Sequence, residues 1–134
     1  MTPAAEESLI RLRVSAADAH YGGGLVDGAR VLEFFGDAVT EVLIRHDGDE
    51  GLMRAYSEVE FLAPVHGGDF LEVRALLEEV GRTSRKVRCT AHKVIELGAQ
   101  RGSAARVLPE PQLVARALAV AVVPLARQRA AGSA

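Results

Sequence analysis

The chain has 134 residues, 49% of them hydrophobic and 25% charged, and its 16 Lys and Arg against 18 Asp and Glu give a formal net charge of −2. These values are ordinary for a globular domain. They argue against a disordered chain, a collagen or a disulfide scaffold, and give no reason to expect a nucleic-acid partner. The length predicts one domain over residues 1–134, with a core at about 9–125 and short flexible tails.

The single cysteine, Cys89, cannot form an internal disulfide and indicates a reducing compartment. Residues 1–7 lack a basic-then-apolar signal, and the longest apolar run, near 117–123, is too short to span a membrane. We therefore expect a cytosolic protein with no membrane partner. An enzyme of this length is expected to complete its pocket with a second subunit.

The first half of the chain predicts a strand, a loop and one long helix. Apolar residues alternate over 9–15, and a glycine-containing loop follows at 16–24. Residues 27–45 carry apolar side chains at helical spacing, with Asp27 as a plausible N-cap and Gly48 ending the pattern. Residues 46–51 are predicted to form an acidic loop.

The second half predicts four strands. Alternation is present at 59–65, 71–77 and 87–91, with Cys89 on an apolar face, and residues 98–111 are predicted to be a loop. Residues 113–125 fit a helix or a buried strand, and their valines favour a strand. Hairpins between these strands would give an antiparallel sheet, and the apolar helix must pack on it, which predicts a two-layer α+β domain.

Charge is unevenly distributed along the chain. Residues 33–60 contain eight acids and two bases, a net of −6, whereas residues 82–93 contain five bases and no acid, a net of +5. A local basic patch suits a small anionic ligand better than a duplex. The plain alternative is a strand with a solvated Lys and Arg face.

The segment His20-Tyr-Gly-Gly-Gly-Leu-Val-Asp-Gly-Ala-Arg-Val-Leu-Glu-Phe-Phe-Gly-Asp37 resembles the loop and central helix of hot dog fold acyl-CoA enzymes. With the loop His46-Asp-Gly-Asp-Glu-Gly51, it is most similar to the ammonia lyases of 3-aminobutyryl-CoA and β-alanyl-CoA. The resemblance implies a sheet around one central helix. It also implies a homodimer or higher oligomer that binds acyl-CoA between subunits and reversibly eliminates ammonia to give an enoyl-CoA such as crotonyl-CoA.

The resemblance places the catalytic carboxylate at Glu33 in the helix. Burial beside an apolar pocket would raise the pKa of such a group. Asp27 is either only the N-cap or also a ligand for the substrate ammonium. His20 is either a general acid or base or a surface histidine, and Asp18 is a further candidate, whereas Asp37 and Glu41 are expected to be solvated.

Several residues are predicted to bind the substrate. The backbone N–H groups of Gly28 and Ala29 could polarise the thioester carbonyl at the helix N-terminus. Tyr21 is expected to line the pocket, and Gly22, Gly23 and Gly24 either allow close backbone approach or form a flexible loop. Contacts to the CoA phosphates are predicted from four residues of the basic stretch: Arg82, Ser84, Arg85 and Lys86.

No cofactor is expected, because the thioester itself acidifies the α-carbon and coenzyme A is part of the substrate. His46, His66 and His92 lack metal-ligand spacing, so no metal site is predicted. Three alternatives to the ammonia lyase stay open: an acyl-CoA thioesterase, an enoyl-CoA hydratase and a non-catalytic CoA-binding module. Asp27 and the acidic loop favour the lyase, since an ammonium substrate favours extra negative charge nearby.

Overall fold

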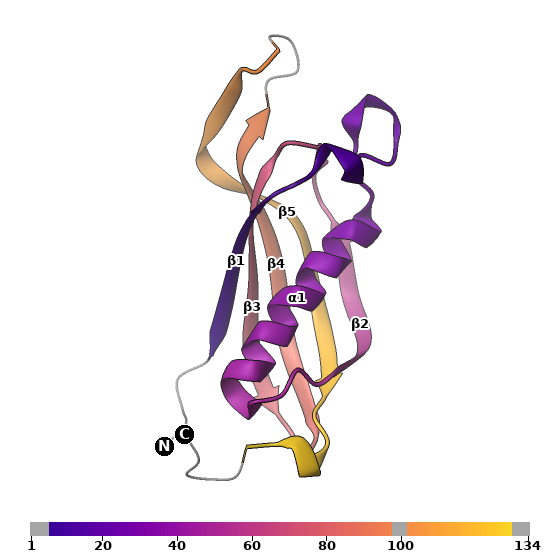
Figure 1. The fold of residues 1–134 in the computed structure, drawn as a ribbon, viewed down its shortest axis with the longest axis vertical. Coiled ribbons are helices and arrows are strands. Elements are labelled where there is room, and N and C mark those ends of the chain that lie inside the picture. The colour runs from indigo at the N-terminus through magenta and orange to yellow at the C-terminus, as the bar shows by residue number, and fades with distance from the viewer. Residues whose placement is uncertain (1–5, 98–101, 130–134) are drawn as a thin grey trace.

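A computed structural model describes residues 6–97 and 102–129 (Figure 1). One helix, α1 (Gly28–Asp47), lies across a face of a five-stranded antiparallel sheet, which confirms the α+β prediction. The strands are β1 (Glu7–Arg13), β2 (Leu52–Phe61), β3 (Phe70–Val80), β4 (Ser84–Leu97) and β5 (Ala105–Val122). Short 3-10 helices occupy Ala16–Asp18, Gly22–Gly24 and Leu125–Arg127.

Both ends of α1 are capped by the residues that the sequence indicated. The Asp27 carboxylate accepts a hydrogen bond from the Arg30 N–H at 3.0 Å, which is the bond expected of an N-cap. Gly48 ends the helix in the left-handed region, with φ of 77°, and its N–H donates to the Ile44 carbonyl at 2.9 Å. The helix runs two residues beyond the predicted 27–45, because Asp47 belongs to its last turn.

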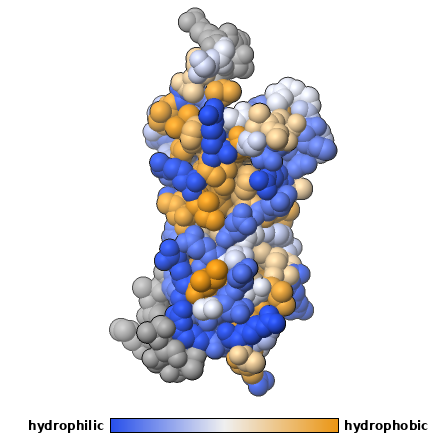
Figure 2. Space-filling view, viewed as in Figure 1, coloured by the Kyte–Doolittle hydropathy of each residue, from blue (hydrophilic) through white to orange (hydrophobic). Residues whose placement is uncertain are grey.

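The apolar stripe of α1 packs on the sheet. Its buried hydrophobic residues follow helical spacing and are Val31, Phe34, Phe35, Ala38, Val39, Val42 and Leu43. The opposite side of α1 is mostly hydrophilic, while apolar residues gather beside it in the upper half of the molecule (Figure 2). The helix therefore buries its apolar stripe against the sheet and presents its polar side to solvent.

The strand order is β1-β3-β4-β5-β2, which corrects the predicted chain of hairpins. β2 does not pair with β3; it crosses to the opposite edge and pairs antiparallel with β5, with Leu52 opposite Val122. β2 also begins and ends earlier than the predicted 59–65. Its exposed N-terminal half lacks a buried alternating face within the single chain, so the alternation rule could not place it.

The inner face of the sheet forms most of the core. Cys89 lies there at 0% exposure, as predicted, between cross-strand neighbours Ala75 and Ala117. Burial raises the pKa of the Cys89 thiol to about 12. Tyr56 links β2 to the helix, because its hydroxyl donates a hydrogen bond to the Leu32 carbonyl of α1 at 2.8 Å.

β5 is longer than predicted. Part of the predicted loop at 98–111 belongs to it, since residues 105–107 pair with 95–97 of β4, while residues 98–101 lie outside the described part. Pro109 and Pro111 are tolerated because the register shifts between Lys93 and Ile95, which interrupts the ladder there. The later segment is a strand, as its valines indicated. Within the described ranges, no helix is long and apolar enough to cross a membrane.

Candidate active site

An open cavity of about 420 Å³ lies at the N-terminus of α1. Its walls come from the loop before α1, the first turn of α1, the segment after β2 and the middle of β5. The lining is mostly apolar: Tyr21, Leu25, Val26, Asp27, Gly28, Val31, Phe61, Leu62, Ala63, Pro64, Val65, Val114 and Ala115. Three predicted site residues, Tyr21, Asp27 and Gly28, therefore meet at one cavity whose walls suit a small apolar group.

The first turn of α1 presents donors to this cavity. The N–H groups of Gly28 and Ala29 precede the first intrahelical hydrogen bonds, so they have no helical partner and lie at the positive end of the helix dipole. A Cβ on Gly28 would come within 2.5–2.9 Å of the Phe61 ring carbons. Glycine at this position therefore lets the ring lie directly over the helix N-terminus.

Glu33 is exposed in the single chain and does not line the cavity. Its side chain is 67% exposed, and its Oε2 accepts a hydrogen bond from Arg30 Nη1 at 3.0 Å. Arg30 also contacts Asp18, with Nε 3.1 Å from Oδ1, and its guanidinium lies 4.6 Å from the Phe34 ring centroid. The burial expected for Glu33 is thus not provided by one chain, and Asp18 is already ion-paired.

His20 and Tyr21 form a pair at the mouth of the cavity. Their ring centroids are 5.2 Å apart in an edge-to-face arrangement, and both side chains are exposed. Tyr21 lines the cavity, whereas His20 does not. Gly23 and Gly24 have φ of 73° and 78° with open space around them, so the loop requires their left-handed conformation and not close packing.

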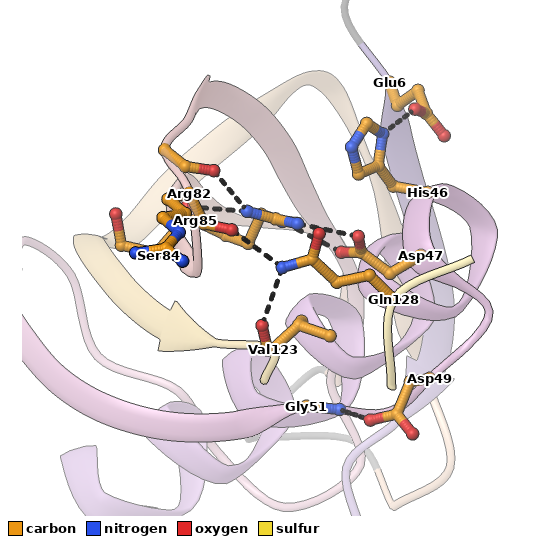
Figure 3. Close-up of polar contacts among 11 residues, drawn as sticks. Glu6, His46, Asp47, Asp49, Gly51, Arg82, Ser84, Arg85, Val123 and Gln128 are labelled. Atoms are coloured by element: carbon orange, nitrogen blue, oxygen red, sulfur yellow. Dashed lines mark hydrogen bonds and ion pairs between the residues drawn. The ribbon is translucent and has the colours of Figure 1, made fainter. Parts of the chain in front are cut away.

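The predicted CoA residues lie at the other end of the molecule. Arg85 is 2% exposed, and its Nε and Nη2 donate to the two carboxylate oxygens of Asp47 at 2.9 and 2.8 Å (Figure 3). Its Nη1 donates to the carbonyls of Gly81 and Ser84 at 2.8 and 3.0 Å. The guanidinium is fully committed inside the chain, so we do not retain Arg85 as a phosphate ligand.

The other bases of the +5 stretch are mostly paired as well. Lys86 lies 3.1 Å from Glu79, Arg88 lies 2.7 Å from Glu78, and Lys93 lies 3.3 Å from Asp69. Arg82 is exposed and has no ion pair among the described residues. Its backbone carbonyl accepts a hydrogen bond from the Gln128 side-chain amide, which also donates to the Val123 carbonyl (Figure 3). The basic stretch is therefore not one continuous free patch.

One chain does not bring the two halves of the predicted site together. Asp47 and its partner Arg85 mark the C-terminal end of α1, whereas Asp27 marks the N-terminal end. A helix of 20 residues is about 30 Å long. The acidic loop after Asp47 is likewise at the far end from Asp27, so it cannot supply negative charge to the same cavity within one chain.

A second cavity, of about 680 Å³, lies beside the first and contains charged residues that the prediction missed. Lys93 is 4% exposed and Asp69 is 1% exposed, and both line this cavity. The Asp69 carboxylate also accepts hydrogen bonds from the N–H groups of His66 and Leu97, at 2.8 and 3.3 Å. The two cavities share Pro64 in their walls.

The family model of the thioesterase superfamily matches residues 23–96 of the chain. The chain belongs to this superfamily. A 3-aminobutyryl-CoA ammonia lyase of Acetoanaerobium sticklandii is 53% identical over 124 residues, which cover 92% of this chain and 98% of that protein.

Solved structures of the superfamily have the same architecture. The β-alanyl-CoA:ammonia lyase from Clostridium propionicum superposes with a TM-score of 0.88 at 35% identity, covering 92% of this chain and 89% of that one. A hexameric hot dog fold thioesterase of Campylobacter jejuni superposes with a TM-score of 0.71 at 17% identity, covering 90% and 85%. The hot dog prediction is therefore confirmed.

One feature of the sequence of this thioesterase-superfamily chain could have indicated the second cavity. Lys93 continues the inward phase of Val87, Cys89 and Ala91 on β4, so a lysine stands where the alternation calls for an apolar side chain. A charged residue in that phase needs a buried partner. That partner, Asp69, comes from the loop before β3, and only the fold shows the pairing.

No group of three or more His, Cys, Asp or Glu side chains gathers at metal-binding distances within residues 6–97 and 102–129. His92, for instance, lies on the outer face of β4 opposite Glu72. Burial, with the nearby Arg74 charge, lowers the pKa of His92. The absence of a metal or cofactor in catalysis stays a prediction.

Proposed function

We propose that the chain is a 3-aminoacyl-CoA ammonia lyase that reversibly converts 3-aminobutyryl-CoA to crotonyl-CoA and ammonia. The observation that carries this function is the 53% identity to a 3-aminobutyryl-CoA ammonia lyase over nearly the whole of both chains. The likeness to the β-alanyl-CoA:ammonia lyase, at 35% identity and a TM-score of 0.88, supports the same reaction class.

The helix N-terminus is suited to the chemistry of this reaction. A base takes the proton from the carbon next to the thioester carbonyl, and the electron pair of that carbon–hydrogen bond becomes the second bond of the carbon–carbon double bond. The carbon–nitrogen bond of the substrate ammonium breaks with its electron pair on nitrogen, which releases ammonia. Negative charge grows on the thioester oxygen during this step. The free N–H groups of Gly28 and Ala29 would stabilise that oxygen, and the dipole of α1 acts in the same direction.

Two carboxylates are assigned roles in this proposal. Glu33 acts as the base at the α-carbon, and Asp27, whose Oδ1 is engaged in the cap, contacts the substrate amine through its other oxygen. His20 and Tyr21 border the same entrance, and His20 would relay the proton between ammonia and solvent. Coenzyme A enters as part of the substrate, and no separate cofactor takes part.

A second copy of the chain would complete the site. β2 is an edge strand whose side chains Leu52, Met53 and Phe61 are 59%, 40% and 54% exposed, and its free edge can pair with another β2. Antiparallel pairing reverses the second copy. It sets the N-terminal end of one α1 level with the C-terminal end of the other, and brings Arg82, Ser84 and Lys86 of the partner subunit toward the first cavity.

The same arrangement would cover Glu33, which lies exposed on α1 of the single chain. Several superfamily structures, including the thioesterases of Campylobacter jejuni and Yersinia pestis, are described as hexameric. We therefore propose a homodimer as the catalytic unit, with further assembly of dimers. Sedimentation equilibrium measures the oligomeric state, and a fully active monomer would refute the shared site.

The decisive assay mixes the purified chain with crotonyl-CoA and ammonium and follows the loss of enoyl absorbance, with mass spectrometry of the product. Glu33→Gln is expected to abolish ammonia addition by a factor of at least about 100. Asp37→Asn, one turn further along the exposed side of α1, is the matched control and should retain activity. No amination of crotonyl- or acryloyl-CoA by the wild type would refute the lyase.

The match to the thioesterase superfamily model favours one alternative, an acyl-CoA thioesterase. Hydrolysis releases free coenzyme A, which a thiol reagent detects. We expect no such release from butyryl-CoA under conditions that give rapid amination of crotonyl-CoA. Release of thiol without amination would assign the chain to the hydrolases.

A further inference from the structure

The Arg30 side chain is held by contacts from three directions on the first turns of α1. Its Nε lies 3.1 Å from Asp18 Oδ1, its Nη1 lies 3.0 Å from Glu33 Oε2, and its guanidinium lies 4.6 Å from the centroid of the Phe34 ring. Asp18 belongs to the 3-10 helix before α1, so the arginine bridges two elements. The Nε atom is also shielded from solvent. Contacts outside the ion pair with Glu33 therefore already restrict the arginine.

A second arginine–glutamate pair on the same helix lacks this support. Arg45 Nη2 lies 2.8 Å from Glu41 Oε2, but the arginine is 62% exposed and has no other ion pair among the described residues. The Arg30 side chain is 36% exposed. A pair between two mobile side chains contributes little, because both lose rotamer freedom in forming it. Since Arg30 is already restricted, its contact with Glu33 fixes the glutamate more firmly than Arg45 fixes Glu41.

The contact with Arg30 leaves one carboxylate oxygen of Glu33 available. The guanidinium donates to Oε2, and no hydrogen bond within residues 6–97 and 102–129 reaches Oε1. A general base needs a free oxygen that points in a fixed direction, because the proton must lie within hydrogen-bond reach of it. A donor on Oε2 restricts the rotation of the carboxylate and so fixes the direction of Oε1. The pair is therefore suited to orienting a base.

The charges of this cluster also suit a base that acts beside a substrate ammonium. Asp18 balances Arg30, so the three side chains of Asp18, Arg30 and Glu33 together carry one net negative charge. A carboxylate that a partner subunit covers is costly to keep ionised unless a cation accompanies it. Arg30 supplies that cation, and Asp18 offsets the repulsion that a lone guanidinium would exert on the amine.

We propose that Arg30 is the positioning residue of the catalytic base: anchored on Asp18 and Phe34, it orients the Glu33 carboxylate and keeps it ionised when the partner subunit covers it. The proposal rests on the proposed function, because it takes Glu33 to be the base at the α-carbon. Arg30 acts through Glu33 in this role and does not contact the substrate. Asp18, a candidate acid or base from the sequence, is thereby assigned to the anchor and not to proton transfer.

Elimination of ammonia from 3-aminobutyryl-CoA, followed by the rise in enoyl absorbance, tests this role. Arg30→Met keeps an apolar stem against Phe34 and removes the cation. We expect kcat to fall at least about tenfold with KM within about twofold, since a charged hydrogen bond is lost and no substrate contact changes. Arg45→Met removes the exposed pair with Glu41 and is the matched control, which should keep both constants. An unchanged kcat in Arg30→Met, or an effect on KM alone, would overturn the proposal.

The pH profile of kcat separates an effect on the base from a general loss of structure. Within the described part of the chain, the charged groups around the Glu33 carboxylate are Arg30, Asp18 behind it, and Asp37 four positions further along α1. A carboxylate that loses its cation takes up a proton more readily. The acid limb of kcat for elimination should therefore move to higher pH in Arg30→Met and return in Arg30→Lys. A lower kcat with an unmoved acid limb would indicate a structural effect and refute the role.

A double-mutant cycle shows whether Arg30 acts through Glu33. No base remains in Glu33→Gln, so adding Arg30→Met to it should cause little further loss of kcat. Losses that multiply would give Arg30 a role independent of Glu33 and would contradict the proposal. Wild-type protein without lyase activity would refute the proposed function, and the role of Arg30 with it.

Two further measurements do not depend on the folding of Arg30→Met. Arg30→Gln keeps a donor for Asp18 but removes the charge, and should show the same fall in kcat and the same shift of the acid limb. A crystal structure of the wild-type oligomer gives an answer without any substitution. Arg30 within hydrogen-bond distance of a Glu33 that the partner subunit covers supports the proposal, and a Glu33 paired with a different cation refutes it.

Discussion

The buried ion pair between Asp47 and Arg85 gives a sharp prediction about stability. Arg85→Met leaves the Asp47 carboxylate 4% exposed, with no cation beside it and at the negative end of the α1 dipole. Breaking a buried pair in this way costs about 3–5 kcal/mol. For a chain of this length that corresponds to a fall in Tm of about 10–20 °C.

Removing the other partner of the pair, Asp47, should lower the free energy of unfolding by less. Asp47→Ala leaves Arg85 near the carbonyls of Gly81 and Ser84, which its Nη1 already contacts, and near the negative end of α1, which favours a cation. We expect a loss of about 2 kcal/mol, the size of a charged hydrogen bond. The double variant Asp47→Leu/Arg85→Met removes both charges and should be more stable than Arg85→Met alone.

Urea denaturation followed by circular dichroism measures all three free energies of unfolding. An m-value equal to that of the wild type shows that the variants unfold from the same compact state. A free energy of unfolding for Arg85→Met within about 1 kcal/mol of the wild type would refute a costly buried charge, since about 1 kcal/mol is the least expected for a lost buried hydrogen bond. A larger loss of unfolding free energy for Asp47→Ala than for Arg85→Met would contradict the same prediction.

Three further outcomes follow from single positions. Gly23→Ala forces an L side chain to φ of 73° and should cost about 1 kcal/mol, whereas Gly22→Ala in the same open loop has no positive φ and should be neutral in thermal denaturation. Gly28→Ala displaces the Phe61 ring, which is 54% exposed and can swing away. We therefore expect a raised KM for crotonyl-CoA with little change in Tm, and a large fall in Tm would contradict this. The Cys89 thiol, with its pKa raised by burial to about 12, stays protonated when the unfolded thiol ionises. The free energy of unfolding should therefore fall by about 1.4 kcal/mol per pH unit between about pH 9 and pH 10, below the range in which Tyr56, whose pKa burial also raises to about 12, adds a slope of its own. Cys89→Ala should remove the slope in that window, and its persistence there would refute the assignment.

Local sequence patterns were sufficient to predict α1 and the inner face of the sheet. The apolar repeat of α1 matches its buried face, and Asp27 and Gly48 cap it as predicted, because caps act within one helical turn. Cys89 lies in the core because strand alternation fixes which side chains face the helix.

Long-range features were not predictable in the same way. In the sequence, Asp47 is one acid in an acidic run and Arg85 is one base in a basic run, but they are neighbours in space although they lie 38 positions apart in the chain. Their pairing depends on where the C-terminal end of α1 meets the β3–β4 turn. For the same reason, the sequence could not show that Glu33 is exposed in one chain.

The position of β2 at the far edge of the sheet has a consequence for how the chain folds. β2 precedes β3 in sequence, but its hydrogen-bonding partner is β5. The pairing of Leu52 with Val122 can therefore form only after β5 has been synthesised. Contacts between residues so far apart in sequence form slowly, because the chain loses conformational entropy on closing the long loop before the contacts can stabilise it. We expect β1, β3, β4 and α1 to associate first and β2 to dock last, when synthesis is nearly complete. A subunit that is still being translated therefore lacks the edge on which its partner would assemble.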